Sequence, residues 1–461
     1  SEVLPALAEV ERAVQTGLSA VGFVAYEAAR GFDKAFPEAQ ARIPLVWFGL
    51  YEQLSVCPHP LPPLPPRGRG GILAWRDGSP LPRGGRGAGG EGKRGVPILE
   101  ELIRRENGQG IESLKWRSTL SPSTYYCAVQ RIRDYIEAGD VYQVNYSFRL
   151  RTTTHSDCST LLSLFCQLYD AQPVPYAAYI DTGEHVILSL SPELFFALEG
   201  EHIVSRPMKG TAPRGVTLED DLKQAQALRC SEKNRAENLM IVDMVRNDLG
   251  RIARVGSVRV PRLFEAERYA TLWQMTSTVV ACTDAPLPEI FRALFPAASI
   301  TGAPKIRATH VIQALERAPR GVYTGAIGVV LPHRRAQFNV AIRTLHHDKA
   351  AGQLEYGVGS GVVWDSEQVA EYAECLAKAQ VLLAPRPEFE LLETLLWRLF
   401  HEEEVRVLPD VVLSRGCRCS VDHIRRVLEQ FPEAERAEMR NGDGVISVDC
   451  EFCSRQFLLE V

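Results

Sequence analysis

Two short segments place a glutamate and a lysine in settings that suit acid–base or nucleophilic chemistry. SPELF puts Glu193 at the end of an expected strand, and RPMKGTAPRG puts Lys209 beside Gly210 and Thr211. Backbone amides beside a glycine can approach an anion closely. The same lysine also fits a solvated turn residue, so this segment by itself supports both interpretations.

A second set of ionisable residues follows helical spacing. Glu371, Glu374 and Lys378 lie at i, i+3 and i+7 and therefore share one helix face. In KNRAENLMIVDMVRNDLG, Glu237 and Asp248 share a face with apolar residues, and a buried carboxylate needs a partner. The pattern fits surface ion pairs and a salt bridge. It equally fits oxygen ligands for Mg²⁺ from Glu237, Glu371 and Glu374.

Glycine-rich segments surround a further cationic residue. SITGAPK (299–305), RGVYTGAIG (320–328) and YGVGSGVVWDS (356–366) offer backbone donors, and Arg343 suits bidentate binding of a carboxylate. GVGSG is not a dinucleotide fingerprint, because it lacks both the GxGxxG spacing and the acidic residue that follows in a βαβ unit. Together these residue types suit a small dianionic substrate.

The eleven cysteines are unevenly distributed. Seven are scattered singly through the first 416 residues, as expected for buried small hydrophobic residues. The other four form a C-x-C and a C-x-x-C pair separated by thirty residues: Cys417, Cys419, Cys450 and Cys453. Two close thiolate pairs satisfy the tetrahedral coordination of Zn²⁺, and disulfides are the alternative.

Hydrophobic periodicity and turn residues indicate how the chain is organised to position these groups. The predicted segments are 1–56, a helix and strands from a domain that lacks its earlier strands; 57–97, a Pro/Gly/Arg-rich disordered insertion; 98–384, one large α+β domain; 385–398, a linker; and 399–461, a small zinc-binding module. Within the large domain, one long helical stretch is expected from about Asp220 to Leu249.

Composition excludes several classes of protein. With 52 Lys+Arg against 57 Asp+Glu, the net charge of -5 gives no basic excess that would favour nucleic acid or anionic lipid. The longest apolar runs are about ten residues, short of the ~20 that cross a bilayer, and the first residues lack the pattern of a secretion signal. We expect a soluble, cytoplasmic protein with no nucleic-acid or membrane partner.

Nine segments in order resemble the chorismate-utilising enzyme family over roughly residues 115–384: GDVYQVN, SPELF, RPMKGT, AENLMIVDMVRNDLG, SITGAPK, RGVYTGAIG, AIRT, YGVGSGVVWDS and EYAEC. The resemblance implies an α+β fold, an α/β sandwich of two stacked antiparallel sheets with helices outside. It also implies that chorismate is held through Mg²⁺ on Glu237, Glu371 and Glu374. The residues implied to bind chorismate are Gln143, Thr301, Gly302, Tyr323, Arg343, Gly357, Gly359, Gly361 and Lys378.

Three positions bear on the branch of this family. Lys209 matches a lysine of the enzymes that make 4-amino-4-deoxychorismate for 4-aminobenzoate and folate, where anthranilate synthases typically have alanine. Gln143 stands where the water-adding members carry a general-base lysine, and Gln274 where anthranilate synthases usually have histidine. The resemblance thus implies that Lys209 attacks carbon 2 of chorismate, that Glu193 protonates the leaving hydroxyl at carbon 4, and that ammonia then displaces the lysine. An anthranilate synthase is the nearest alternative.

Two further expectations concern the source of ammonia and the cysteine-rich tail. No cysteine of the large domain has the glycine-flanked context of a glutaminase nucleophile, so we expect a separate glutamine amidotransferase subunit. The tail from about residue 396 resembles the C-terminal zinc redox-switch domain of heat shock protein 33, whose substrate-binding core is absent here. The alternative function from another class is a redox-sensing, chaperone-like zinc module on an inactive chimeric chain.

Overall fold

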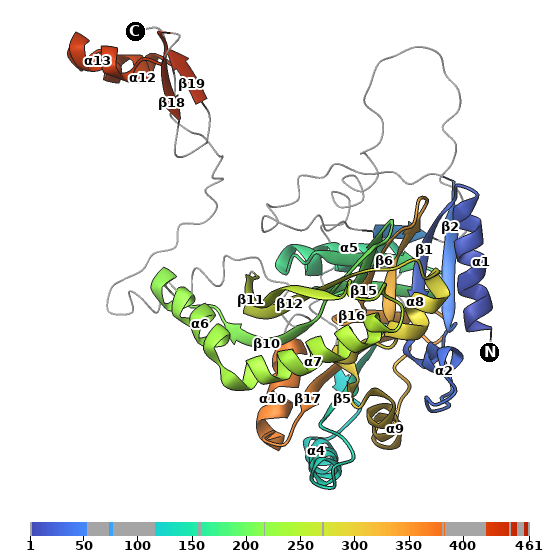
Figure 1. The fold of residues 1–461 in the computed structure, drawn as a ribbon. Coiled ribbons are helices and arrows are strands. Elements are labelled where there is room, and N and C mark those ends of the chain that lie inside the picture. Colours follow the sequence, from blue (N-terminus) through green and yellow to red (C-terminus); the bar gives the residue numbers. More distant parts are fainter. Residues whose placement is uncertain are drawn as a thin grey trace. The chain divides into compact units, whose positions relative to one another are not determined.

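The computed structural model of the chain divides into two units, Ser1–Pro387 and Glu388–Val461 (Figure 1). The described residues are 2–52, 73–76, 116–154, 158–215, 217–269, 272–379, 382, 421–441, 444–449 and 456–459. The disorder predicted for 57–97 concerns residues outside this set, apart from four that form a strand. The predicted linker, 385–398, lies outside it entirely.

Two sheets form the centre of the first unit. Within the described residues, sheet A has nine strands in the order β10-β12-β9-β8-β15-β14-β1-β2, with β11 paired to β12. Its strands are β1 (Ser19–Val24), β2 (Val46–Tyr51), β8 (Leu194–Glu199), β9 (His202–Arg206), β10 (Met208–Pro213), β11 (Arg259–Arg268), β12 (Leu272–Cys282), β14 (Ala326–Leu331) and β15 (Arg335–Val340).

Sheet B has eight strands in the same part of the chain, in the order β13-β5-β17-β16-β7-β6-β3, with β4 paired to β5. Its strands are β3 (Leu73–Arg76), β4 (Arg117–Ser118), β5 (Gln143–Thr153), β6 (Tyr176–Asp181), β7 (His185–Ser191), β13 (Gly302–Ala303), β16 (Thr344–Asp348) and β17 (Gln353–Val362). The β3–β6 pair is parallel, and the other described pairs of both sheets are antiparallel.

Helices pack on both sheets. They are α1 (Val3–Gln15), α2 (Ala29–Phe32), α4 (Pro122–Glu137), α5 (Cys158–Ala171), α6 (Leu218–Cys230), α7 (Glu232–Gly250), α8 (Leu287–Leu294), α9 (Lys305–Leu315) and α10 (Gln368–Ala379), with short 3₁₀ turns η1 (Tyr26–Ala28) and η3 (Ala298–Ile300). Helices α1, α7 and α8 share a core with sheet A, whereas α4, α5, α9 and α10 share one with sheet B. A third cluster, which includes Phe23, Ile180, Ile187 and Ile327, joins the two sheets. The predicted α+β sandwich of stacked sheets with outer helices is confirmed.

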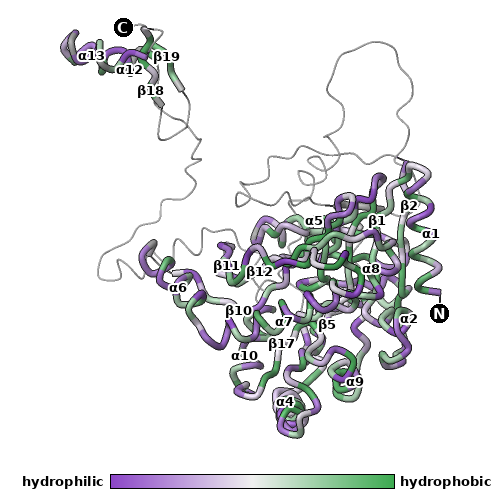
Figure 2. Tube along the Cα trace, viewed as in Figure 1, coloured by the Kyte–Doolittle hydropathy of each residue, from purple (hydrophilic) through white to green (hydrophobic). Residues whose placement is uncertain are grey.

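Burial on both faces explains the composition of the central strands. All seven residues of β7 (HVILSLS) are buried, including its three polar residues His185, Ser189 and Ser191, because both faces of the strand are covered. In Figure 2, hydrophobic colour gathers among the central strands, whereas polar colour follows α6 and the outer strand β11.

The single helical stretch expected from Asp220 to Leu249 is wrong, because it is two helices. Ser231 ends α6 and caps α7, and its hydroxyl accepts a hydrogen bond from the backbone N–H of Asn234. A serine that accepts this bond satisfies a donor that the first turn of a helix leaves unpaired. The chain therefore turns at Ser231 instead of continuing one helix.

The second unit has a small core of its own. Helices α12 (Val421–Leu428) and α13 (Glu433–Met439) accompany a hairpin of β18 (Ile446–Asp449) and β19 (Gln456–Leu459). Leu428, Ile446 and Leu459 form its core. The four predicted zinc ligands lie outside the described residues.

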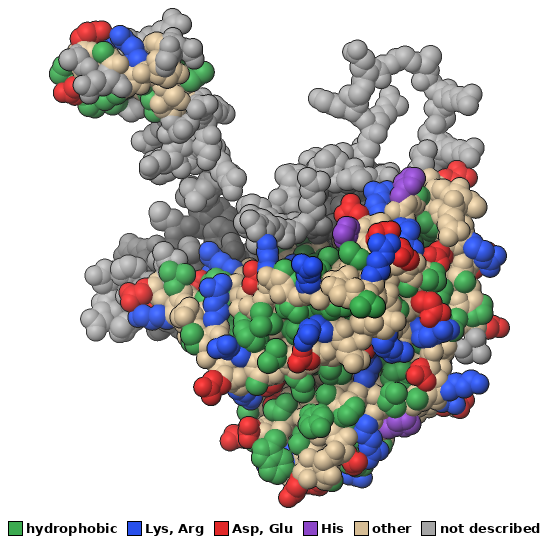
Figure 3. All heavy atoms as spheres, in the orientation of Figure 1, with side chains coloured by type: hydrophobic (Ala, Val, Ile, Leu, Met, Phe, Trp, Pro, Cys, Tyr) green, Lys and Arg blue, Asp and Glu red, His purple; other side chains and the backbone are tan. Residues whose placement is uncertain are grey.

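Two properties of the structure relate to the expectation that the protein has no nucleic-acid or membrane partner. Among the helices that the structure describes, none is both long enough and apolar enough to cross a membrane. On the face seen in Figure 3, basic and acidic side chains are interspersed, as expected from the nearly balanced charge.

Candidate active site

Glu193 lies where the chain crosses from one sheet to the other. β7 ends at Ser191 in sheet B, and β8 begins at Leu194 in sheet A. Glu193 is 3% exposed, and the Ser299 hydroxyl donates to its Oε1 at 2.6 Å. Burial raises the pKa of Glu193 to about 7, although Ser299 and Lys209 both act to lower it. A carboxyl group with this pKa holds a proton to near neutral pH, as a general acid requires.

Lys209 extends from β10, at one end of sheet A, toward strands of sheet B. Its Nζ lies 3.4 Å from Oδ1 of Asn145 on β5. Gly361 on β17 lies next to the Lys209 amine, since a Cβ added at Gly361 would be 2.6 Å from Lys209 Nζ. Burial lowers the pKa of Lys209, while the nearby Glu237 acts to raise it. A lysine with a lowered pKa has a larger neutral, nucleophilic fraction.

Buried amide groups without partners surround this lysine. Gln143 is fully buried, and neither its Oε1 nor its Nε2 has a hydrogen-bond partner among the described residues. The Nδ2 of Asn145 is also unpartnered within that set. Buried polar groups are normally satisfied, and unpaired ones are costly. This cluster therefore suits a polar substrate that would supply the missing hydrogen bonds.

Three glutamates from two helices influence one another electrostatically. Burial raises the pKa of Glu237 on α7, and the charges of Glu371 and Glu374 on α10 raise it further. Within the described part of the chain, no three His, Cys, Asp or Glu side chains form a ready-made metal cluster. Mg²⁺ commonly takes only one or two protein carboxylates, together with waters and substrate oxygens. The facing glutamates fit that kind of site, and Ser366 already orients Glu371 by donating to its Oε1 at 2.7 Å.

Two further cations predicted to bind substrate differ in their pairing. Lys378 Nζ lies 2.7 Å from Glu374 and donates to the Gly359 carbonyl at 3.0 Å. Arg343 forms no ion pair within the described residues and hydrogen-bonds to Gln172 at 3.3 Å. Burial lowers the pKa of Arg343, although Tyr356 and Tyr269 act to raise it. A half-buried guanidinium without a carboxylate partner among the described residues suits an anionic ligand.

The predicted glycines are sites of close packing. A Cβ at Gly357 would lie 2.3 Å from the ring of Tyr323, and one at Gly359 would lie 2.4 Å from the Tyr146 carbonyl. Gly302 has a φ of +144°, and a Cβ there would lie 2.1 Å from the Gln143 carbonyl. Their most direct role is to let neighbouring groups approach. The hydroxyl of Thr301, which is fully buried, donates to the Ala297 carbonyl at 3.0 Å.

A buried ionic network that sequence reasoning missed lies behind the site. Arg320 donates to Glu316 at 2.6 Å and to the Asn145 carbonyl at 2.7 Å. The guanidinium of Arg149 lies 4.9 Å from the ring centroid of Tyr323. Arg149 belongs to the same network, because its guanidinium lies 3.8 Å from Glu316. Arg320 therefore holds the backbone of Asn145, and Arg149 holds the ring of Tyr323. The RG pair of RGVYTGAIG was the available signal, but no sequence pattern identifies its partners.

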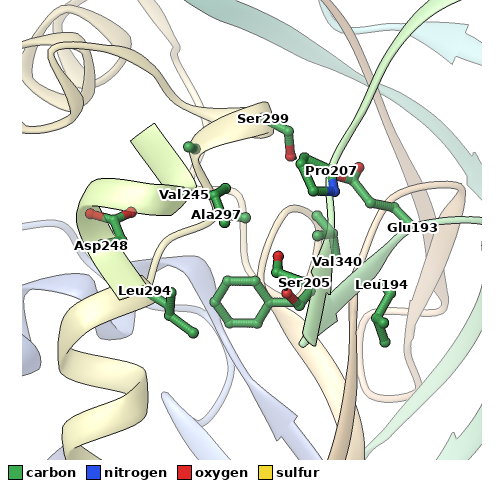
Figure 4. Close-up of a pocket in the computed structure, with 12 residues that line it drawn as sticks. Glu193, Leu194, Ser205, Pro207, Val245, Asp248, Leu294, Ala297, Ser299 and Val340 are labelled. Atoms are coloured by element: carbon green, nitrogen blue, oxygen red, sulfur yellow. Dashed lines mark hydrogen bonds between the residues drawn. The ribbon is translucent and has the colours of Figure 1, made fainter. Parts of the chain in front are cut away.

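The partner expected for Asp248 is a lysine. Lys305 Nζ lies 2.6 Å from its Oδ2, so the salt-bridge alternative for Asp248 is confirmed. A small cavity, with room for about one water molecule, has Glu193 and Asp248 at its opposite ends (Figure 4). Ser299, the hydrogen-bond donor to Glu193 that sequence reasoning missed, also lines this cavity.

Comparisons with known proteins show which families and proteins this chain is similar to. The profile of the family described as chorismate binding enzyme matches residues 2–384, and that of Hsp33 protein matches 364–460. Aminodeoxychorismate synthase component 1 of Klebsiella aerogenes is 42% identical over 270 residues, which are 58% of this chain and 59% of that protein. Its Escherichia coli (strain K12) counterpart is 39% identical, with 58% of each chain covered. Anthranilate synthase component 1 of Thermus thermophilus is 37% identical over 58% of each chain.

The match thus spans less than two thirds of the length of these relatives. Among solved structures, anthranilate synthase component I from Streptococcus pneumoniae TIGR4 has a TM-score of 0.64 at 24% identity, covering 82% of this chain and 85% of that chain. This likeness concerns the fold alone. The family profile covers most of the chain, from residue 2 to residue 384. The chain belongs to the family of chorismate binding enzymes.

Proposed function

We propose that this chain is the chorismate-aminating component of an aminodeoxychorismate synthase. It would convert chorismate and ammonia into 4-amino-4-deoxychorismate, the precursor of 4-aminobenzoate in folate synthesis. The observation that carries the proposal is the buried amine of Lys209, with its lowered pKa, in a site that also holds Glu193, a buried carboxyl group whose pKa is raised to about 7. Relatives named aminodeoxychorismate synthase component 1 support it.

The chemistry follows from the two groups. The neutral amine of Lys209 attacks carbon 2 of the ring, and Glu193 protonates the hydroxyl that leaves carbon 4. Ammonia then attacks carbon 4 and expels the lysine. Gln143 is a neutral amide and cannot act as a general base for water, which disfavours hydration of the ring.

The remaining residues bind and orient the substrate. Arg343 and Lys378 would pair with its carboxylates, and Tyr323 would lie against it with Thr301 and the glycine-rich backbone of Gly302 and 357–361. Glu237, Glu371 and Glu374 would hold Mg²⁺, which would neutralise a substrate carboxylate and help position the ring.

The ammonia would come from a separate glutamine amidotransferase subunit, because the relatives are named as component 1 of a two-part enzyme. We also propose that the protein is located in the cytoplasm. In the tail, Cys417, Cys419, Cys450 and Cys453 would bind Zn²⁺, in agreement with the Hsp33 match at residues 364–460.

The test is incubation of the protein with chorismate, Mg²⁺ and ammonium, with and without added aminodeoxychorismate lyase. We expect 4-aminobenzoate only when the lyase is present. Anthranilate without lyase would instead establish the rival activity. Absence of turnover, together with oxidation-dependent zinc release and suppression of aggregation, would favour the redox-sensing tail as the functional part.

The role of Lys209 needs a matched pair of variants. Lys209→Ala should abolish amination, because no other described lysine contacts Asn145 and Gly361. Lys223→Ala removes an exposed lysine that pairs with Glu219 on α6, and it should leave the rate unchanged. Unchanged turnover in Lys209→Ala would refute the covalent role.

A further inference from the structure

The strand that carries Lys209 is irregular at that residue. Between Met208 and Thr211, two residues of β10 stand opposite a single residue of β12. Those two residues are Lys209 and Gly210. Such a bulge interrupts the ladder of backbone hydrogen bonds and redirects the side chains at that point. Gly210 has a φ of +92°, a backbone conformation that favours glycine.

The side chain of Gln274 on β12 holds both residues that follow Lys209. Its Nε2 donates to the Gly210 carbonyl at 2.8 Å, and its Oε1 accepts a hydrogen bond from the Thr211 hydroxyl at 3.2 Å. Gln274 is 8% exposed, so its amide is largely shielded from water. From α7, Asn234 packs against the bulge, since a Cβ at Gly210 would lie 3.1 Å from the Asn234 Cβ.

The bulge also borders the second reactive group of the site. The backbone N–H of Met208 donates to the carboxyl group of Glu193 and acts to lower its pKa. The next residue is Lys209, whose Nζ lies 3.4 Å from Oδ1 of Asn145. The conformation of the bulge therefore sets where the amine lies relative to Glu193. A displacement of about 1 Å between reacting groups costs roughly 10²-fold in rate.

We propose that Gln274 is a positioning residue for the amination: by holding Gly210 and Thr211, it fixes the bulge from which Lys209 reaches the substrate. This inference rests on the proposed function and adds to it a residue that acts through Lys209. Both polar atoms of the Gln274 amide already bond to the bulge, so its action on the reaction is indirect.

The first test compares kcat and KM in the lyase-coupled assay. Gln274→Met keeps a side chain of similar length but removes both hydrogen bonds, so kcat should fall by about 10²-fold. The KM for chorismate should stay at the parent value, because Arg343 and Lys378, the proposed carboxylate ligands, are unchanged. Thr211→Val removes only one of the two bonds and should lose less activity than Gln274→Met.

The second test reads the environment of the Lys209 amine without turnover. The full chain, without chorismate, is acetylated with acetic anhydride over a range of pH, and each lysine is followed by peptide mass spectrometry. In Gln274→Met the midpoint for Lys209 should rise, because the amine leaves the place where burial lowers its pKa. The exposed Lys223 should give the same profile in both proteins. The charged groups that face Lys209 are Glu237 on α7, Glu374 and Lys378 on α10, and Glu193.

Gln337→Met is the matched control, since it replaces a half-buried glutamine on β15 of the same sheet. It should keep both the parent kcat and the parent labelling profile. An unchanged kcat in Gln274→Met, or a fall in kcat with an unchanged Lys209 profile, would overturn the inference. If Gln274→Met does not fold, Gln274→Asn, whose shorter amide cannot reach both partners, must show the same two changes, and their absence there overturns it as well. A parent protein that does not aminate chorismate would instead refute the proposed function.

Discussion

Gly361→Ala is the change that tests the position of the Lys209 amine most directly. The new Cβ would lie 2.6 Å from Lys209 Nζ, 2.5 Å from Gln143 Nε2 and 3.1 Å from Asn145 Oδ1. Non-bonded atoms are comfortable only at about 3.5–4.0 Å. The two closest atoms are at the ends of flexible side chains, so the amine would move by about 1 Å while the strand stays in place.

The expected loss follows from this displacement. A misplacement of about 1 Å in a reacting group costs roughly 10²-fold in rate. That factor corresponds to about 2.7 kcal/mol of activation free energy. Folding should not suffer, because alanine is less costly than glycine within a strand by roughly 0.5–1 kcal/mol. The variant should therefore be stable and slow.

The assay is the lyase-coupled formation of 4-aminobenzoate, measured as kcat beside a thermal melt. Gly49→Ala is the control: its Cβ would crowd the hydroxyl of Tyr51 at 2.6 Å, another side-chain end, on the terminal strand of sheet A. It should keep the parent kcat. Full activity in Gly361→Ala would refute the requirement for this position of Lys209, and a fall in activity matched by a lower Tm would assign the effect to folding.

Three other expectations follow from the structure. Because Glu193 has a pKa of about 7 and would act in its protonated form, the amination rate should fall as pH rises through about 7. Glu193→Gln should have a low rate without this decline. If the decline persists in Glu193→Gln, another group causes it. Arg320→Met should lower the free energy of unfolding in urea by about 3–5 kcal/mol, since it leaves Glu316 without its closest buried partner; Arg246→Met, at an exposed pair, should cost at most about 1 kcal/mol. Elemental analysis of the reduced full chain should find zinc, which replacement of the four clustered cysteines by serine should remove while the amination rate is kept; a metal-free parent protein contradicts this.

The motif residues could be predicted from the sequence because they carry their chemistry in short segments. The α+β sandwich was predicted, and Glu193 lies at a strand end as SPELF indicates, but the crossing from one sheet to the other at this point was not predicted. The partners of these residues could not be predicted. Asn145 meets Lys209, and Ser299 meets Glu193, only because two sheets and η3 come together over long separations in the chain. Likewise, a serine inside a helical pattern gives no sign that it caps the following helix, and Ser231 was missed for that reason.

The amine of Lys209 and the surface on which it rests belong to different sheets. Lys209 is carried by β10 of sheet A, whereas Gln143, Asn145 and Gly361 belong to β5 and β17 of sheet B. The sheets are joined by the apolar cluster around Phe23, Ile180 and Ile187. Any substitution that lets one sheet slide over the other would thus move the Lys209 amine relative to Gln143, Asn145 and Gly361. Residues of this apolar cluster are therefore expected to affect the amination rate without contacting the substrate. Selection for activity should then act on these core residues as well.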